Sequence, residues 1–205
     1  MSEEIVERVD RSQQLPEAAW QVIGENGFRT VRIADVATRV GVSTGTVHYY
    51  FPTKRDLLLA AFKYNIDQSA ARRVDVYEKA QNPLDQLRAF VESYLPISDE
   101  TIITWRLWTE FWAEGLHDAT IQTMNDLSYG AWRDLIESLI SAAQRDNRIR
   151  PGDPASMANC LVAVMDGLAM QVVLNSSRVN ASIMRYTCFS LLDSWTTETQ
   201  MPSVV

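Results

Sequence analysis

Apolar residues recur at helical spacing along nearly the whole chain, and the alternation typical of β-strands is almost absent. In residues 33–40, for example, they fall at i, i+3, i+4 and i+7, which is the spacing of one helix face: Ile33, Val36, Ala37 and Val40. Gly and Pro number only 8 and 7 among 205 residues, and many of them stand between the periodic segments. The sequence therefore predicts an all-α fold.

These breaks divide the chain into about nine helices. Residues 1–50 hold one longer helix and two short ones separated by a tight turn, and a long amphipathic helix runs from Thr53 toward Lys79. Five further helices are predicted at about 84–95, 99–115, 118–146, 154–175 and 180–196. We therefore expect a three-helix N-terminal domain, residues 1–52, followed by an antiparallel helical bundle, residues 53–205.

The composition is that of a globular protein, with 46% hydrophobic and 22% charged residues. A disordered chain would carry too little apolar surface to offset the entropy of ordering it. The two cysteines, Cys160 and Cys188, fit a reducing compartment, and the N-terminus lacks the uncharged apolar run of a signal peptide. These features predict a cytoplasmic protein.

The most apolar stretch, Cys160 to Leu174, is only 15 residues long and contains Asp166. A membrane-spanning helix needs about 20 apolar residues. The stretch is therefore predicted to be a buried helix, and no membrane partner is expected.

Residues 41–51 have the pattern of a helix-turn-helix corner. Gly41 tolerates positive φ and would end the preceding helix, and Ser43 is a good N-cap for the next one. Val47 and Phe51, four residues apart, would face the core. Small and aromatic hydrogen-bonding residues are left on or near the outer side: Thr44, Gly45, Thr46, His48, Tyr49 and Tyr50. The pattern favours DNA binding; the alternative is a helical corner with a tyrosine-rich surface.

The segment from about 12 to 62 resembles the N-terminal signature of TetR-type transcriptional regulators nearly position by position. The matching motifs are Phe28, Ile33-Ala34-Asp35-Val36-Ala37, Gly41-Val42-Ser43, Gly45-Thr46-Val47-His48-Tyr49-Tyr50-Phe51 and Lys54-Arg55-Asp56-Leu57-Leu58. The resemblance implies an all-α homodimer that represses promoters. It also implies that the protein releases DNA when a small-molecule effector enters its C-terminal bundle.

The resemblance also implies which residues contact double-stranded DNA. Residues 44–50 correspond to the recognition helix, and the middle residue of the aromatic run usually bonds phosphate in the family. Lys54 matches a basic residue that holds the DNA backbone, and Thr53 and Asp56 suit the start of its helix. The candidate DNA-binding residues are Arg32, Ser43, Thr44, Gly45, Thr46, His48, Tyr49, Tyr50 and Lys54.

Two residues depart from the family pattern. Arg32 stands where a Ser or Thr usually caps the first helix of the pair; this predicts a cap weaker by about 1 kcal/mol, although Arg32 can instead reach a phosphate. Pro16 replaces an apolar residue inside the first helix. The first helix is therefore expected to start effectively near Leu15, with residues 1–12 either loose or separately helical.

The later helices contain a tryptophan face, because Trp105, Trp108 and Trp112 fall at i, i+3 and i+7. Most such faces are simply core. The functional alternative is an aromatic cavity wall that attracts organic cations, with Glu110, Glu114 or Asp166 as the anionic group. This region resembles the BetI-type, choline-responsive subgroup, and the candidate ligand-binding residues are Phe90, Tyr94, Trp105, Trp108, Trp112, Trp132, Asp166 and Met170.

The last two helices are predicted to form the dimer surface. The segment from Cys160 to Leu174 is apolar nearly all round, and a second apolar stripe follows: Ile183, Tyr186, Phe189, Leu191, Leu192 and Trp195. The family resemblance favours a four-helix interface between two copies. Such a dimer would set two recognition helices one DNA turn apart on a palindromic operator.

Other classes of function fit less well. The chain has two histidines, His48 and His117, and no spacing that suggests a metal site, a phosphate-binding glycine loop or a nucleophilic serine. No enzyme activity, cofactor or metal is therefore expected. A helical small-molecule-binding protein without DNA binding is the second alternative, and the intact run from Gly41 to Lys54 speaks against it. A transcriptional activator with the same fold remains open.

The formal net charge of −7 argues against a generally basic nucleic-acid coat, but the charge is unevenly distributed. Residues 28–63 hold six bases and two acids, whereas residues 64–205 hold eleven bases and eighteen acids. The predicted DNA-binding end is therefore locally positive. The acidic bundle would repel DNA and favour a cationic guest.

Overall fold

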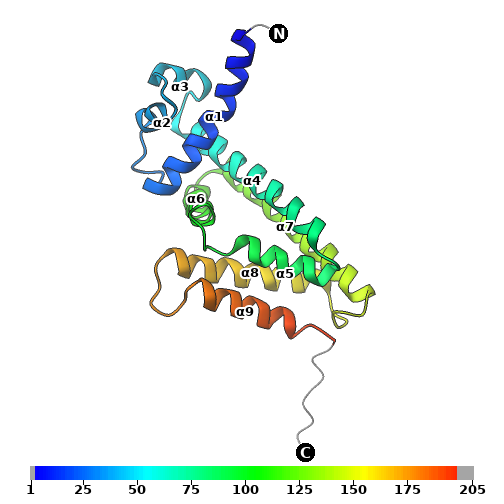
Figure 1. The fold of residues 1–205 in the computed structure, drawn as a ribbon. Coiled ribbons are helices and arrows are strands. Elements are labelled where there is room, and N and C mark those ends of the chain that lie inside the picture. Colours follow the sequence, from blue (N-terminus) through cyan, green and yellow to red (C-terminus); the bar gives the residue numbers. More distant parts are fainter. Residues whose placement is uncertain (1–2, 198–205) are drawn as a thin grey trace, which may run out of the picture. The chain divides into compact units, whose positions relative to one another are not determined.

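The computed structural model describes the backbone of residues 3–197 and the side chains of residues 13–71 and 80–197. This part of the chain contains nine helices (Figure 1). They are α1 (Glu3–Asn26), α2 (Ile33–Val40), α3 (Thr44–Tyr50), α4 (Lys54–Lys79), α5 (Pro83–Tyr94), α6 (Asp99–Gly115), α7 (Ala119–Arg145), α8 (Pro154–Val173) and α9 (Ala181–Asp193). The all-α prediction is confirmed, and the predicted helices agree with the observed ones to within a few residues.

The helices form two compact units that do not follow the chain order. Unit 1 comprises Met1–Ser69 and Ile102–Thr123, and unit 2 comprises Ala70–Thr101 and Met124–Val205. Unit 1 thus joins α1, α2, α3 and the first part of α4 to most of α6. The boundary between residues 52 and 53 stays a prediction about functional domains.

Helix α1 runs without interruption through Pro16. Proline has no N–H and therefore removes one hydrogen bond from a helix interior. The packing of the second half offsets this loss, because Leu15, Ala19 and Ile23 are fully buried. The structure thus differs from the expected start near Leu15: the backbone is already helical from Glu3.

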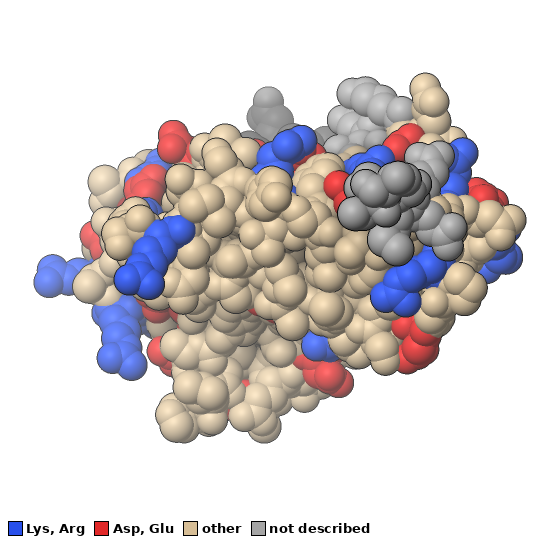
Figure 2. All heavy atoms as spheres, turned by 90° about the horizontal axis from the view of Figure 1, so that it is seen from below, with Lys and Arg blue, Asp and Glu red and all other residues tan. Residues whose placement is uncertain are grey.

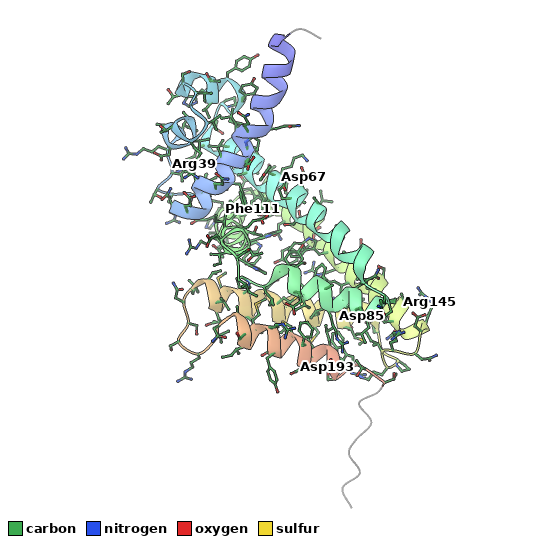
Figure 3. The ribbon with its side chains drawn as sticks, in the orientation of Figure 1. Arg39, Asp67, Asp85, Phe111, Arg145 and Asp193 are labelled. Atoms are coloured by element: carbon green, nitrogen blue, oxygen red, sulfur yellow. The ribbon has the colours of Figure 1, made fainter. Side chains whose placement is uncertain are left out.

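The core of unit 1 joins α1, α4 and α6. The Phe62 ring of α4 stacks on Phe111 of α6 at a centroid distance of 3.4 Å, and it meets Trp108 edge-on at 4.5 Å (Figure 3 labels Phe111). The indole Nε1 of Trp20 in α1 donates a hydrogen bond to Asn65 Oδ1 in α4 at 3.0 Å. These contacts fix α1 and α6 against α4.

Helices α1 and α6 approach closely at Gly24, which is buried. A Cβ atom built on Gly24 would lie 2.4 Å from Ile103 Cγ2 and 3.2 Å from the Ile103 carbonyl oxygen. Non-bonded carbon atoms normally stay about 3.5–4 Å apart. The residue facing Ile103 therefore has to be glycine for this packing.

Unit 2 is held together by α5, α8 and α9. Helices α8 and α9 pack side by side, and α9 also packs against α5 (Figure 1). Arg88 of α5 forms an ion pair with Asp193 at the end of α9 at 2.8 Å, and Arg185 pairs with Glu92 (Asp193 is labelled in Figure 3). The ion pairs thus lie at both ends of the α5–α9 contact.

Helix α8 is 20 residues long, and it is the one helix in the described part of the chain that is long and apolar enough to cross a membrane. The length of the apolar stretch in α8 therefore does not by itself distinguish a buried helix from a membrane-spanning one. Core helices of globular proteins pass the same test. In unit 2, α8 buries Met157, Leu161 and Met165 and packs against α9.

Candidate DNA interface and ligand site

The corner between α2 and α3 has the predicted helix-turn-helix geometry. Gly41 has a φ of 75°, in the left-handed region that glycine adopts without strain. The N–H of Val42 donates to the Ala37 carbonyl at 2.9 Å, which closes the end of α2. Val36 and Val47 are fully buried and fix the two helices on the core of unit 1.

Ser43 caps α3 as predicted. Its Oγ accepts the backbone N–H of Thr46 at 3.0 Å and lies 2.9 Å from the Thr46 hydroxyl. The Ser43 and Thr46 hydroxyls are thus already paired with each other in the protein alone. Thr44 and Gly45 form the exposed part of the first turn of α3, where base edges would lie.

The aromatic run occupies the second half of α3. His48 and Tyr49 are exposed, the latter with 65% of its surface accessible, and Tyr50 is half-buried. The rings of Tyr49 and Tyr50 meet edge to face at 5.2 Å. This contact holds the two phenol rings against each other at the end of α3.

The cap of α2 is stronger than the sequence suggested. Asp35, the third residue of the helix, accepts the backbone N–H of Arg32 on its Oδ2 at 2.7 Å. The carboxylate thus supplies half of a capping box and suits the positive end of the helix. The Arg32 side chain is exposed at this helix N-terminus, where it can reach a phosphate.

Lys54 fastens the start of α4 to the loop before α2. Its Nζ donates to the Arg29 carbonyl at 3.0 Å and lies 4.7 Å from the centre of the Phe28 ring. The start of α4 is itself a reciprocal cap, because the Thr53 N–H donates to Asp56 at 3.0 Å and the Asp56 N–H donates to Thr53 at 3.1 Å. Lys54 therefore holds the loop before α2 against the start of α4.

Three of the six bases between residues 28 and 63 are neutralised by ion pairs. Arg39 pairs with Glu25 at 2.6 Å, Arg55 with Asp118 at 2.5 Å and Lys63 with Asp67 at 2.9 Å (Arg39 and Asp67 are labelled in Figure 3). Hydrogen bonds from Arg39 and Arg55 lower the pKa of Glu25 and of Asp118. Of the six bases between residues 28 and 63, the three outside these ion pairs are Arg29, Arg32 and Lys54, so the unpaired positive charge of this segment lies at the start of α2, in the loop before it and at the start of α4.

The candidate ligand residues fall in different units. Trp105 and Trp108 are almost fully buried in unit 1, where Trp108 contacts Phe62, and Trp112 is half-buried beside Trp108 at 5.8 Å. This packing fits the interpretation of the tryptophan face as core. The other candidates all belong to unit 2: Phe90, Tyr94, Trp132, Asp166 and Met170.

Unit 2 brings four aromatic rings into one aromatic cluster, consisting of Phe90, Tyr94, Tyr129 and Trp132. Tyr94 lies 4.8 Å from Phe90 and 4.5 Å from Trp132, and Tyr129 lies 5.9 Å from Trp132. Tyr129 was not among the residues predicted for the ligand site, although it precedes Trp132 by three residues and so shares its helix face.

Asp166 of α8 lies at the edge of this cluster. The Tyr129 hydroxyl donates to Asp166 Oδ2 at 2.8 Å. Burial raises the pKa of Asp166 to about 6, so the carboxylate is ionised at neutral pH, and burial also raises the pKa of Tyr129. An ionised carboxylate beside aromatic rings attracts an organic cation. Met170 is half-buried one turn further along α8.

A separate cleft of about 670 Å³ lies between α1 and α4 in unit 1. Its lining contains none of the candidate ligand residues and consists of Gln13, Gln14, Pro16, Glu17, Ala60, Lys63, Tyr64, Asp67 and Gln68. The grouping of aromatic rings with a carboxylate therefore favours the aromatic cluster, and not this cleft, as the ligand site.

Comparison with known families gives two matches. Residues 15–61 match the family of bacterial regulatory proteins of the tetR type, and residues 83–196 match the C-terminal domain of BetI-type transcriptional repressors. The first match covers the helix-turn-helix and the start of α4. The second covers the aromatic cluster, Asp166 and the last two helices.

Individual relatives agree with these matches. The HTH-type transcriptional regulator BetI of Stenotrophomonas maltophilia is 32% identical over 191 residues, which are 89% of this chain and 91% of that protein. The regulator PksA of Bacillus subtilis is 27% identical over 85% of this chain and 84% of that protein. A transcriptional regulator from Saccharomonospora viridis, solved in complex with choline, superposes with a TM-score of 0.87 at 28% identity over 92% of this chain and 98% of that one.

Proposed function

The chain belongs to the TetR family of bacterial transcriptional regulators and has a BetI-type C-terminal domain, and from this we propose that it is a homodimeric repressor acting in the cytoplasm. As a TetR-family regulator it is not an enzyme. It binds a palindromic operator through α3. It leaves the operator when an effector, a small organic cation, binds at the aromatic cluster beside Asp166.

The observation that carries the effector proposal is the half-buried carboxylate of Asp166, which accepts a hydrogen bond from Tyr129 of the aromatic cluster. Among the described residues, Asp166 forms no ion pair with a lysine or arginine, and Arg133 acts on its carboxylate only as a nearby positive charge. A cation that enters the cluster meets both the carboxylate and the negative faces of the rings. The choline-bound relative supports the same class of ligand.

The exposed face of α8 and α9 supports the homodimer. Leu174, Ile183 and Tyr186 expose 68%, 42% and 75% of their surface, although all three are large and hydrophobic. Figure 2 views the protein from the side on which α9 lies and shows a broad area of uncharged residues, with most charged side chains toward its margins. Large hydrophobic side chains left exposed in this way, together with a surface poor in charge, are typical of a protein–protein interface.

The experiment that tests the proposal begins with selection of DNA fragments, by the purified protein, from the genome of its source. We expect the selected fragments to share a sequence with twofold symmetry and half-sites about 34–36 Å apart. Choline is expected to release the protein from this DNA, whereas its uncharged isostere, 3,3-dimethylbutan-1-ol, is not. Release by both compounds alike would show that shape, and not charge, is recognised.

Asp166→Asn is expected to weaken choline binding by at least about tenfold, because it removes the carboxylate charge but keeps an acceptor for Tyr129. The pKa of Asp166 in the folded protein is near 6, above its ordinary value of 3.8. The free energy of unfolding therefore falls as pH rises from about 4 to 6, because the unfolded chain ionises more readily than the folded one. The ligand-free variant should therefore melt at a higher temperature than the wild type at pH 8, but not at pH 4.

Calorimetric titration with choline and thermal melting at the two pH values measure both effects. For the wild type, the affinity for choline should also fall as pH drops below about 6, because the carboxylate is then protonated. If Asp166→Asn binds choline as tightly as the wild type, Asp166 is not part of the ligand site.

Tyr49→Phe and Lys54→Ala are each expected to weaken operator binding about three- to tenfold without changing the oligomeric state, because phosphate contacts position the recognition helix. Lys54→Ala should also reduce the slope of log affinity against log salt concentration by about one. Fluorescence anisotropy of a labelled operator at several salt concentrations measures both quantities.

The controls are Tyr64→Phe and Lys63→Ala, two matched substitutions further along α4. Neither residue is a candidate DNA contact, and Lys63 is paired with Asp67. Both controls should bind the operator like the wild type. If Tyr49→Phe and Lys54→Ala also do so, these side chains do not contact DNA.

A further inference from the structure

Arg133 lies beside the aromatic cluster but has no role in the proposed recognition of a cation. It follows Tyr129 by four residues on α7, and its guanidinium carbon lies 5.1 Å from the centre of the Tyr129 ring. Its Nε is shielded from solvent and has no hydrogen-bond partner. Buried polar groups are almost always hydrogen-bonded, so an unsatisfied guanidinium N–H in this position calls for an acceptor.

Arg133 and Asp166 are not paired with each other. The Asp166 carboxylate takes its hydrogen bond from Tyr129, and Arg133 acts on it only as a nearby positive charge that partly opposes the rise in its pKa. Tyr129 thus contacts both charges, Asp166 through its hydroxyl and Arg133 through its ring face. One negative and one positive group therefore lie around the same tyrosine, each without an ionic partner in the described part of the chain.

A purely cationic ligand fits only half of this arrangement. It would neutralise Asp166 and contact the rings, but it would be repelled by Arg133 and leave the Arg133 Nε–H unpaired. A ligand with a cation and an anion a few bonds apart satisfies both groups. Its zero net charge also matches the zero net charge of Asp166 plus Arg133.

We propose that the effector is a zwitterion, a quaternary ammonium compound that also carries a carboxylate. Its ammonium group lies against the aromatic cluster and Asp166, and its carboxylate accepts hydrogen bonds from Arg133. This inference rests on the proposed function and narrows the chemical class of the effector. Arginine suits the role because its planar fork of N–H donors matches a carboxylate.

The test compares choline with glycine betaine, which shares the trimethylammonium group but carries a carboxylate in place of the hydroxymethyl group. Isothermal titration calorimetry with the full-length protein should give glycine betaine an affinity at least about tenfold higher than that of choline. Arg133→Gln removes the positive charge but retains N–H donors. It should lower the affinity for glycine betaine by at least about tenfold and leave the affinity for choline unchanged or higher.

Two further variants make the comparison specific. Arg145→Gln removes an exposed charge from the other end of the same helix (Arg145 is labelled in Figure 3) and should leave both affinities unchanged. Arg133→Lys keeps the charge but loses the planar fork, so it should retain a weaker preference for glycine betaine. Arg133→Lys replaces Arg133→Gln in the test if circular dichroism and thermal melting show that Arg133→Gln does not fold.

Several outcomes would overturn the inference while leaving the proposed function intact. One is a wild-type protein that binds choline as tightly as glycine betaine. Another is an Arg133→Gln variant that binds both compounds more tightly by the same factor. Arg133 would then compete with the ligand's ammonium group for the site and would not bind a carboxylate. If neither compound binds or releases DNA, the cationic effector and this inference fail together.

Discussion

Ile183→Glu is expected to convert the homodimer into monomers and to weaken operator binding by more than about a hundredfold. Ile183 lies on the exposed face of α9, three residues before Tyr186, and both belong to the proposed interface. An unpaired carboxylate buried in an apolar interface costs several kcal/mol. A monomer also contacts only one half-site, so the gain from binding both half-sites at once is lost.

Sedimentation equilibrium measures the oligomeric state. The wild type should have twice the chain mass of 23.2 kDa, and Ile183→Glu should have the mass of a single chain. Ile97→Glu is the matched control: Ile97 is also in unit 2 and is 65% exposed, but it lies in the loop between α5 and α6. The control should stay dimeric and bind the operator normally. An Ile183→Glu variant that remains dimeric would place the interface elsewhere.

Gly24→Ala is expected to lower the free energy of unfolding by about 1–3 kcal/mol, the usual cost of overpacking a core. The new methyl group would lie 2.4 Å from Ile103 Cγ2 and 3.2 Å from the Ile103 carbonyl oxygen. The side chain can rotate away, but the carbonyl moves only if α6 shifts relative to α1. Chemical denaturation followed by circular dichroism measures the loss.

A second substitution separates this clash from other effects of alanine. Ile103→Ala removes Cγ2, the nearest atom, so the double variant should lose less stability than the sum of the two single variants. Gly130→Ala is the control, because a Cβ built there has no atom within 4 Å and alanine favours a helix over glycine by up to about 1 kcal/mol. A Gly24→Ala variant as stable as this control would contradict the close packing of α1 on α6.

The helix-turn-helix corner could be predicted from the sequence because its determinants lie within a few residues of one another. The positive φ at Gly41, the cap from Ser43 and the reciprocal cap of Thr53 and Asp56 each depend on groups at most five residues apart. The hydrogen bond from the Arg32 N–H to Asp35 is equally local. It could have been predicted, because an acidic residue three positions after a cap residue often accepts that residue's backbone N–H.

The charge of the DNA-binding end required the tertiary structure. The sequence gives residues 28–63 six bases, but two of them pair with carboxylates that lie far away in the chain. Arg39 pairs with Glu25, and Arg55 pairs with Asp118, 63 residues later. No local pattern shows such a pair, so the sequence overestimates the charge available to DNA.

The proposed ligand site shows the same division between sequence and structure. The sequence by itself determined the helices, their caps and the helix faces, because hydrophobic period and capping are properties of neighbouring residues. It placed the tryptophan face and Asp166 among the candidates without showing which of them meet. Only the tertiary structure joined Tyr129 to Asp166, because the hydrogen bond between α7 and α8 connects residues 37 positions apart, which packing alone brings together.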